Sequence, residues 1–409
     1  MTGIYKFFQN WKQINEKILP FWSSFFLIGV SFSFIVSDWM LGIFTFSEYI
    51  IGLLMFLLVV TGLFKIERSQ IKWIITILSF LSIHLLLQYG FNQEFNLKIG
   101  VATFIKLSFY IITIIGLYNY IAHQNLKKKF LIYNNFFAIV GCVIGVYIMV
   151  AIYSEGVLPY EFLWQFTRLD NKSYIFSNGN ISFVRMRSLF SEPSYFGFYL
   201  NTILAMNYFN SDKIKINHLF SIIISFSILL TVSYSAIAIM IVITIMYIFS
   251  IKRNNFEWSW FKVIIFGTII LIGAKVYDIF KPFFYNAFIQ RTIDIFTDNS
   301  NSGYFRLFGS WQYVNKNNFL MGNGLGQTPA IWNIYAYMIS DMGIFGLIIF
   351  IMFTLMILRM NKKLGFTFIL LNFSKGGYLS SSFWLLVLLL VVYTNRKEDK
   401  VNSGFLIKT

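Results

Sequence analysis

The chain has 409 residues, of which 57% are hydrophobic and 20% are aromatic, whereas only 12% are charged. A mean hydropathy of +0.67 excludes a soluble domain, because one core cannot bury so much apolar surface. The composition therefore predicts an integral membrane protein. The lysines and arginines behind the formal net charge of +16 do not gather in a basic stripe, so no nucleic-acid partner is expected.

Apolar stretches of the length that crosses a bilayer recur along the chain. One crossing needs about 20 apolar residues, and the pattern predicts an all-α, polytopic membrane protein of about 12 transmembrane helices in a single domain over residues 1–409. A last stretch, 364–393, is broken by Ser374-Lys375-Gly376-Gly377 and predicts two short helices joined by a turn. The other predicted spans lie near 20–37, 43–64, 71–89, 99–121, 130–153, 194–210, 218–232, 234–251, 261–277 and 331–358.

The positions of the basic residues predict an orientation. Cytoplasmic loops of membrane proteins carry an excess of Lys and Arg. With a cytoplasmic N-terminus, most of the 33 basic residues fall in cytoplasmic segments, and the C-terminus lies on the same side. The two longest loops, 154–193 and 278–330, then lie on the outer face. Long loops in a compact protein are usually functional, so the site is expected there.

A few ionisable residues fall inside predicted spans. Lys106 lies within the fourth span, Glu48 near the outer end of the second, and Asp341 within the tenth. Such residues are costly in lipid, so they are expected to pair or to line a polar cavity. For Glu48 and Lys106, a structural ion pair and a functional role both remain open. His84, alone in the third span, is more typical of an interhelical hydrogen bond than of a catalyst.

The first outer loop ends in RMRSLFSEPSYFGFYL, residues 185–200, where a basic segment changes into an apolar helix. Pro193 predicts the first turn of that helix. The positive end of the helix dipole then lies near Arg185, Arg187 and Glu192. Guanidinium and free N–H groups suit an anion, phosphate above all. The alternative is a basic flank at the membrane surface with Glu192 as the helix cap.

The second outer loop contains SGYFRLFGSWQYVNKNNFLMGNGLG, residues 302–326. Arg306 precedes an aromatic segment, which suits a sugar phosphate next to a membrane, although a snorkelling surface arginine is the alternative. The GNGLG pattern lacks the preceding strand and crossover unit of a dinucleotide-binding motif. It favours a tight turn or close backbone approach over a phosphate cradle.

Four segments in a fixed order resemble a known family. They are RMRSLFSEPSYFGFYL, TVSYSAIAIMIVI at 231–243, the 302–326 segment, and NIYAYMISDMGIFGLIIF at 333–350. In their order and topology, over about residues 185–350, they resemble the O-antigen polymerase and ligase superfamily, the Wzy-type membrane glycosyltransferases. The first five helices match only in character. The resemblance implies a fold like that of the glycosyltransferase-C group.

The resemblance also implies a reaction and its partners. Oligosaccharide repeat units on undecaprenyl pyrophosphate would be polymerised into O-antigen or capsular polysaccharide on the periplasmic side of the bacterial inner membrane. The enzyme would need no metal or other cofactor, and a separate co-polymerase would set the chain length.

The leaving pyrophosphate needs its developing negative charge stabilised. Arg187 and Arg306 are the candidate catalytic cations. With no histidine in either outer loop, Glu192 is the candidate base for the acceptor hydroxyl, although it could instead orient Arg187 or that hydroxyl. Asp170 and Asp294 are weaker candidates for the base, as is Asp341. Further candidates for binding pyrophosphate or glycan are Arg185, Arg291, Asn333, Asp341 and Lys106.

Two alternatives to a polymerase remain. The ligases of the superfamily, which attach the glycan to lipid A core, typically carry a histidine just before the asparagine of the last motif, where this chain has Trp332. The histidines His84, His123 and His218 lie in a span or toward the cytoplasm, which disfavours a ligase. A flippase for lipid-linked oligosaccharides needs a path open to both faces, and short outer loops would suffice for it. The chain shows no internal repeat that would support a flippase.

Overall fold

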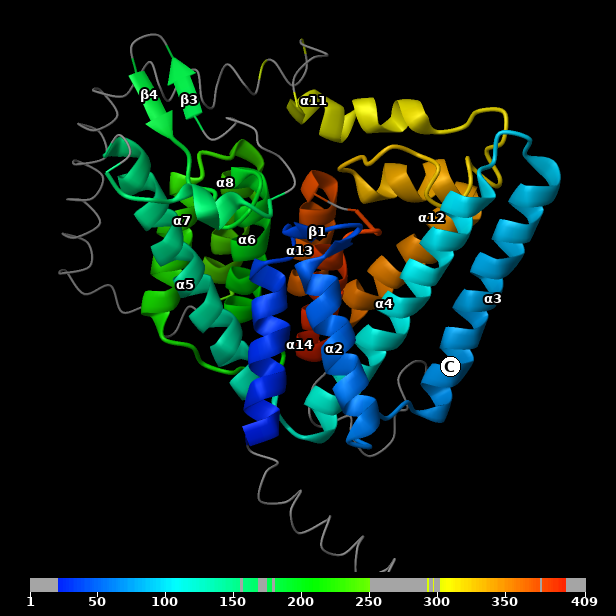
Figure 1. The fold of residues 1–409 in the computed structure, drawn as a ribbon, viewed down its shortest axis with the longest axis horizontal. Coiled ribbons are helices and arrows are strands. Elements are labelled where there is room, and N and C mark those ends of the chain that lie inside the picture. Colours follow the sequence, from blue (N-terminus) through cyan, green and yellow to red (C-terminus); the bar gives the residue numbers. More distant parts are fainter. Residues whose placement is uncertain are drawn as a thin grey trace, which may run out of the picture.

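The computed structural model describes residues 21–154, 157–167, 175–178, 181–250, 302–375 and 377–394, together with 293 and 297. The described chain is mostly helical (Figure 1). Four of its helices are long and apolar enough to cross a membrane, which indicates a membrane-embedded protein. The predicted span at 261–277 lies outside the described residues.

The first half of the chain forms a helix at Phe21–Ile35 and then α2 to α5. A short hairpin, β1 (Met40–Leu41) and β2 (Phe44–Thr45), precedes α2. A 3-10 helix, η1 (Glu161–Trp164), and a second hairpin, β3 (Ile175–Asn178) and β4 (Ile181–Val184), follow α5. The longer helices are α2 (Phe46–Val60), α3 (Arg68–Phe91), α4 (Leu97–His123) and α5 (Lys127–Tyr153).

The second half contributes the helices around the candidate site. Helix α6 is buried on all sides, as expected for a core helix that is apolar all round, and it contacts α5, α7, α8, α13 and α14. These elements are α6 (Pro193–Phe209), α7 (His218–Leu230), α8 (Tyr234–Ile248), α11 (Ser302–Leu307), the 3-10 helix η4 (Gly309–Tyr313), α12 (Ile334–Met360), α13 (Lys362–Lys375) and α14 (Ser381–Thr394).

Each predicted span within the described residues coincides with a helix, and the split of 364–393 into two short helices is confirmed. The helices that meet the length of a membrane crossing are α3, α4, α5 and α12. The crossing of the bilayer by about 12 helices therefore stays a prediction. The two hairpins depart from the predicted all-helical fold. The sequence does not predict them, because strands of two to four residues leave no periodic signal in a hydrophobic chain.

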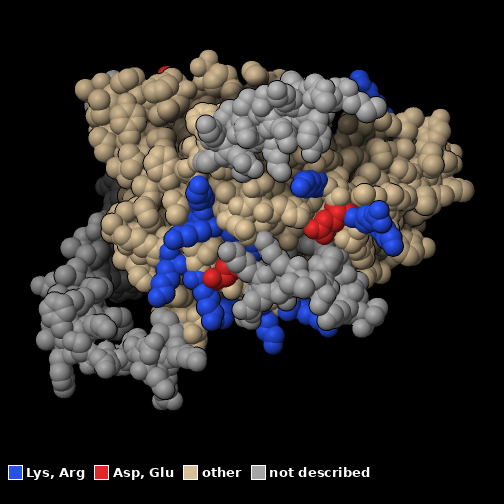
Figure 2. Space-filling view, turned by 90° about the horizontal axis from the view of Figure 1, so that it is seen from below, with Lys and Arg blue, Asp and Glu red and all other residues tan. Residues whose placement is uncertain are grey.

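Basic side chains gather on one face of the molecule. Figure 2 shows Lys and Arg spread over the face seen from below. The α2–α3 and α4–α5 connections lie at that end in Figure 1. Lys65 lies in the first connection, and Arg68 and the run 127–129 begin the helices that follow, α3 and α5. The β3–β4 hairpin and α11 lie at the opposite end. Basic residues at the end that holds the two connections are what the predicted topology requires of its cytoplasmic face, although the orientation itself stays a prediction.

Candidate functional site

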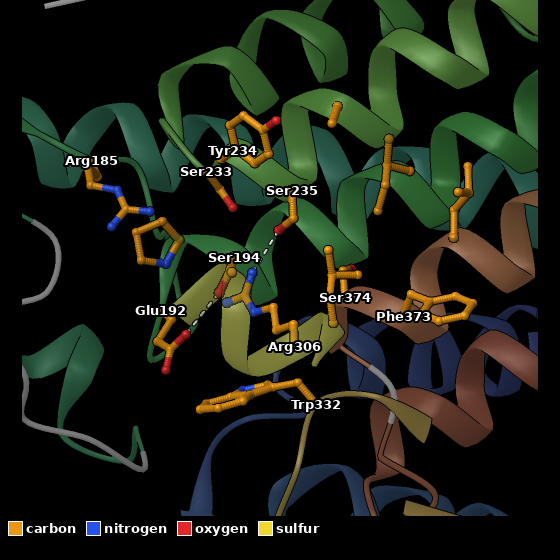
Figure 3. Close-up of a pocket in the computed structure, with 16 residues that line it drawn as sticks. Arg185, Glu192, Ser194, Ser233, Tyr234, Ser235, Arg306, Trp332, Phe373 and Ser374 are labelled. Atoms are coloured by element: carbon orange, nitrogen blue, oxygen red, sulfur yellow. Dashed lines mark hydrogen bonds between the residues drawn. The ribbon is translucent and has the colours of Figure 1, made fainter. Parts of the chain in front are cut away.

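A cavity of about 540 Å³ lies where the starts of α6 and α8 meet α11 and the end of α13 (Figure 3). Its lining includes Arg185 and Glu192 from the first motif segment, Ser235 from the second, and Arg306 from the third. Trp332, which directly precedes the fourth segment, completes the wall. Segments that are more than a hundred residues apart in sequence thus converge on one polar cavity.

Arg306 is held on α11 by contacts with two other elements. Its Nη1 donates a hydrogen bond of 2.9 Å to the Ser235 hydroxyl, and its guanidinium carbon lies 5.9 Å from the centre of the Trp332 ring. Its carbonyl accepts a hydrogen bond of 3.3 Å from Asn333. Figure 3 shows the side chain between Ser235 and Trp332. A guanidinium in a cavity wall suits an anion, because its charge strengthens the hydrogen bonds that it donates.

Glu192 occupies the N-cap position of α6, yet its side chain makes no capping hydrogen bond. Its Oε2 instead accepts hydrogen bonds of 2.9 Å from the Ser194 hydroxyl and 2.9 Å from the Lys375 ammonium. Proline at the next position suits the start of the helix, since its missing N–H group would have had no partner within the helix. Glu192 therefore holds the N-cap position that the alternative interpretation gave it, but its side chain bonds Ser194 and Lys375 and does not cap the helix.

The surroundings of Glu192 determine its charge. Burial alone would raise the pKa of its carboxyl, but the charge and hydrogen bond of Lys375, the hydrogen bond from Ser194 and the charge of Arg306 together lower that pKa below the usual value. Glu192 is therefore ionised at neutral pH. A carboxylate of lowered pKa is a weak base and a strong hydrogen-bond acceptor.

Lys375 is the residue of this site that the sequence reasoning missed. It ends α13, and its Nζ lies 3.4 Å from the centre of the Tyr195 ring and 5.7 Å from that of Trp332. The sequence predicts only a turn at this position. The available signal was an ionisable residue between two apolar half-spans, which by itself marks a functional candidate.

Arg187, by contrast, is not among the residues that line the cavity in the described part of the chain. It is buried, its guanidinium carbon lies 3.4 Å from the centre of the Trp164 ring, and its Nη1 donates to the Ser191 carbonyl at 2.7 Å. The Trp164 ring nitrogen in turn donates to the Ser188 carbonyl at 2.7 Å. The described contacts of Arg187 are therefore with the loop before α6, and the residue does not share the cavity wall with Arg306.

The same loop is fastened from a second side. The buried carboxylate of Asp38 accepts hydrogen bonds from the backbone N–H and the hydroxyl of Ser191, the former at 2.7 Å. The ring nitrogen of Trp39 donates to the Leu189 carbonyl at 2.7 Å. These contacts link the end of the first helix to residues about 150 positions later, which no local motif reveals.

Asn333 and Asp341, predicted to bind substrate, have structural contacts instead. The Asn333 side chain caps α12 by accepting hydrogen bonds from the N–H groups of Tyr335 at 3.0 Å and Ala336 at 3.4 Å. The Asp341 carboxylate is fully buried and accepts hydrogen bonds from the N–H groups of Gly326 and Thr328. Neither residue is among those that line the cavity, so the structure does not bring them into its wall, and their contact with pyrophosphate or glycan stays a prediction.

Asp341 fastens the GNGLG segment, whose tight turn is confirmed. Gly322, Gly324 and Gly326 have φ angles of 70°, 106° and 72°, which L side chains rarely adopt. A Cβ atom at Gly322 would lie 2.6 Å from the Ser340 carbonyl oxygen, so the turn packs directly on α12. The glycines therefore serve close backbone approach, as expected from the sequence.

Lys106 is also absent from the cavity lining, and its ammonium lies 2.8 Å from the Glu48 carboxylate. Glu48 further accepts hydrogen bonds from the Tyr110 hydroxyl and, in the capping box of α2, from the Thr45 N–H. Of the two roles left open for this pair, the geometry matches the structural one. His84 also has a structural contact, because its Nε2 lies 2.8 Å from the Met321 carbonyl oxygen, although that partner belongs to the turn before α12 and not to a helix as expected.

Arg291, Asp170 and Asp294 lie outside the described residues. Within the described part, no group of three or more His, Cys, Asp or Glu side chains is placed to hold a metal ion. In comparisons with known proteins, no family model, no curated protein and no solved structure matches the chain.

Proposed function

We propose that the chain is a polysaccharide polymerase of the bacterial inner membrane, which joins oligosaccharide repeat units carried on undecaprenyl pyrophosphate at the outer face. The observation that carries the proposal is the convergence of the motif segments on one cavity that holds two arginines, a carboxylate and a tryptophan. The resemblance to the Wzy-type enzymes supplies the substrate class.

In the proposed reaction, an acceptor sugar hydroxyl attacks the anomeric carbon of the donor. The new glycosidic C–O bond forms while the bond from that carbon to the pyrophosphate oxygen breaks, and the electron pair leaves with the pyrophosphate. Arg306 and Arg185, both in the cavity wall, stabilise the negative charge on the leaving group. Arg187 contributes by holding the loop that carries Arg185 and Glu192.

Glu192 serves the acceptor in this proposal. Its lowered pKa keeps it ionised, so it accepts a hydrogen bond from the sugar hydroxyl and orients that oxygen toward the donor. The carboxylate takes the proton only as the new bond forms, when the hydroxyl oxygen has become acidic. Trp332 offers an apolar face for a sugar ring in the same wall. The tryptophan also favours a polymerase over a ligase, because ligases of the superfamily have a histidine at that place.

Deleting the gene and separating the surface glycan by gel electrophoresis tests this function. A polymerase deletion removes the ladder of long chains and leaves single repeat units attached to the lipid A core. Loss of all attached glycan, with polymer remaining on the lipid carrier, would instead identify a ligase. Repeat units accumulating on the cytoplasmic leaflet would exclude both enzymes and identify a flippase.

A further inference from the structure

Lys375 is a deeply buried cation beside the cavity, and the mechanism above gives it no role. Its side chain is only 1% exposed, and its ammonium lies 2.9 Å from the Glu192 carboxylate. It comes from α13, whereas Glu192 precedes α6, 183 residues earlier. A buried ammonium is costly unless it is paired, so this contact is a strong constraint on both side chains.

The groups around this pair come from several elements. Tyr195 on α6 and Trp332 before α12 present ring faces to the ammonium. Arg306 on α11 acts on both members of the pair through its positive charge, and Asp38 after the first helix acts on Lys375 through its negative charge. Glu192 keeps 25% of its side chain exposed, while Lys375 keeps almost none. The lysine therefore lies behind the carboxylate, and the carboxylate faces the cavity.

We propose that Lys375 is a positioning residue, which fixes the Glu192 carboxylate at the cavity wall in its ionised form and in the orientation that receives the acceptor sugar. This inference rests on the proposed function, because it assigns the Glu192 side of the cavity to the acceptor and the Arg306 side to the pyrophosphate. Lys375 acts through Glu192 and does not itself contact the substrate.

The physical reason lies in what holds Glu192. The hydrogen bond from Ser194 comes from only two residues along the chain and leaves the carboxylate free to turn. The ammonium restrains the same oxygen from a packed helix, and its charge offsets the burial that would otherwise raise the pKa of Glu192. Without Lys375, the pKa of Glu192 would rise, because burial would be less fully offset, and the carboxylate would lose its fixed direction.

The first test measures polymerisation rates with purified protein in liposomes and synthetic undecaprenyl-pyrophosphate repeat units. Lys375→Met is expected to lower the rate roughly 100-fold, because misplacing one reacting group costs about that much. Lys375→Arg, which keeps the charge, is expected to recover part of the loss. Lys362→Met, at the exposed start of the same helix, is the matched control and keeps the wild-type rate.

A double-mutant cycle separates positioning from direct contact. If Lys375 acts through Glu192, Lys375→Met causes no further loss in a Glu192→Gln background. An equal loss in both backgrounds would mean that Lys375 serves the pyrophosphate independently, and would overturn the proposal. Should Lys375→Met alone fail to accumulate in the membrane, the double variant, which leaves no unpaired charge, and Lys375→Arg still provide the comparison.

A second measurement does not depend on enzymatic activity. The infrared carboxyl band of Glu192, assigned by its absence in Glu192→Gln, is titrated in purified protein. Its midpoint is expected at a higher pH in Lys375→Met than in the wild type, and an unchanged midpoint would refute the positioning role. If the wild type makes no polymer, the proposed function fails, whereas the titration still decides whether Lys375 controls Glu192.

Discussion

The ion pairs Lys106–Glu48 and Lys375–Glu192 have nearly the same length, 2.8 Å and 2.9 Å, but opposite exposure. In the first pair the lysine is 30% exposed and the glutamate 5%, whereas in the second the lysine is 1% exposed and the glutamate 25%. Both glutamates lie at helix starts. The more deeply buried member is therefore the glutamate in the first pair and the lysine in the second.

This difference separates a structural pair from a candidate functional one. Glu48 is surrounded by protein donors, since Thr45, Tyr110 and Lys106 all donate to it. Glu192 receives its donors on one oxygen, Oε2, and lines the cavity. A paired carboxylate that also takes part in a capping box stabilises its helix, whereas a paired carboxylate that faces a cavity can act on a ligand.

The arginines repeat the contrast. Arg187 is buried against Trp164 with a hydrogen bond to a backbone carbonyl, whereas Arg306 is bonded to a serine in the cavity wall. Replacing Arg187 is thus expected to weaken the fold, whereas replacing Arg306 is expected to slow the reaction.

The largest effect is expected for Arg306→Ala. Removing one group that stabilises developing negative charge costs roughly 100- to 1000-fold in rate, so the ladder of long glycan chains should disappear. The amount of protein in the membrane should stay normal, as measured by immunoblot. Arg359→Ala, at the exposed end of α12, is the control and should retain the ladder. A normal ladder in Arg306→Ala would show that the cavity is not the site of the proposed reaction.

A loss of roughly 100-fold is expected for Glu192→Gln, because the amide keeps the shape but loses the charge that orients the acceptor. The rate should be measured at saturating donor, with acceptor varied, so that the defect is located on the acceptor side. Full activity in this variant would show that the exposed carboxylate has no part in the reaction.

Arg187→Ala is expected to act mainly on the fold. It removes a buried charged hydrogen bond and the stacking on Trp164, worth together roughly 2 kcal/mol. Membrane abundance and thermal stability should fall, and the activity per remaining molecule should stay close to that of the wild type. Arg187→Lys should restore little, since an ammonium cannot stack as a planar guanidinium does. Normal abundance with lost activity would contradict this account and indicate that Arg187 acts in the reaction.

The smallest effect is expected for Glu48→Gln, the structural counterpart of Glu192→Gln. The amide oxygen still accepts from Tyr110, but the amide nitrogen then faces the Thr45 N–H. The variant therefore loses one capping hydrogen bond and the charge opposite Lys106, at a cost of roughly 1–2 kcal/mol. A lower unfolding temperature with an unchanged specific rate is therefore predicted, by thermal-shift and liposome assays on the same preparation. If the specific rate of Glu48→Gln were as low as that of Glu192→Gln, the distinction between a structural and a functional ion pair would be wrong.

Much of the helical fold could be predicted because each apolar run is a local signal of sufficient length. The placement of Glu192 and Arg306 in one cavity could also be anticipated, since their motifs combine charge, a helix start and aromatic residues. Lys375 and Asp38 could not be assigned, because their roles depend on contacts with residues 183 and 153 positions away.

Arg187 shows the limit most clearly. Its neighbours in sequence, a second arginine and a helix start, predict an anion site, whereas the structure packs its guanidinium against Trp164 and bonds it to the Ser191 carbonyl. For Asn333 and Asp341, the motif was visible, but the backbone groups that occupy their side chains become apparent only when α12 and the GNGLG turn are folded together.

The most direct test of the central claim is polymer synthesis by the purified wild-type protein in liposomes that contain synthetic undecaprenyl-pyrophosphate repeat units. The cavity mechanism predicts a ladder of products, release of undecaprenyl pyrophosphate with each added unit, and loss of both in Arg306→Ala. Absence of any product longer than one repeat unit from folded wild-type protein in the same liposomes would contradict it.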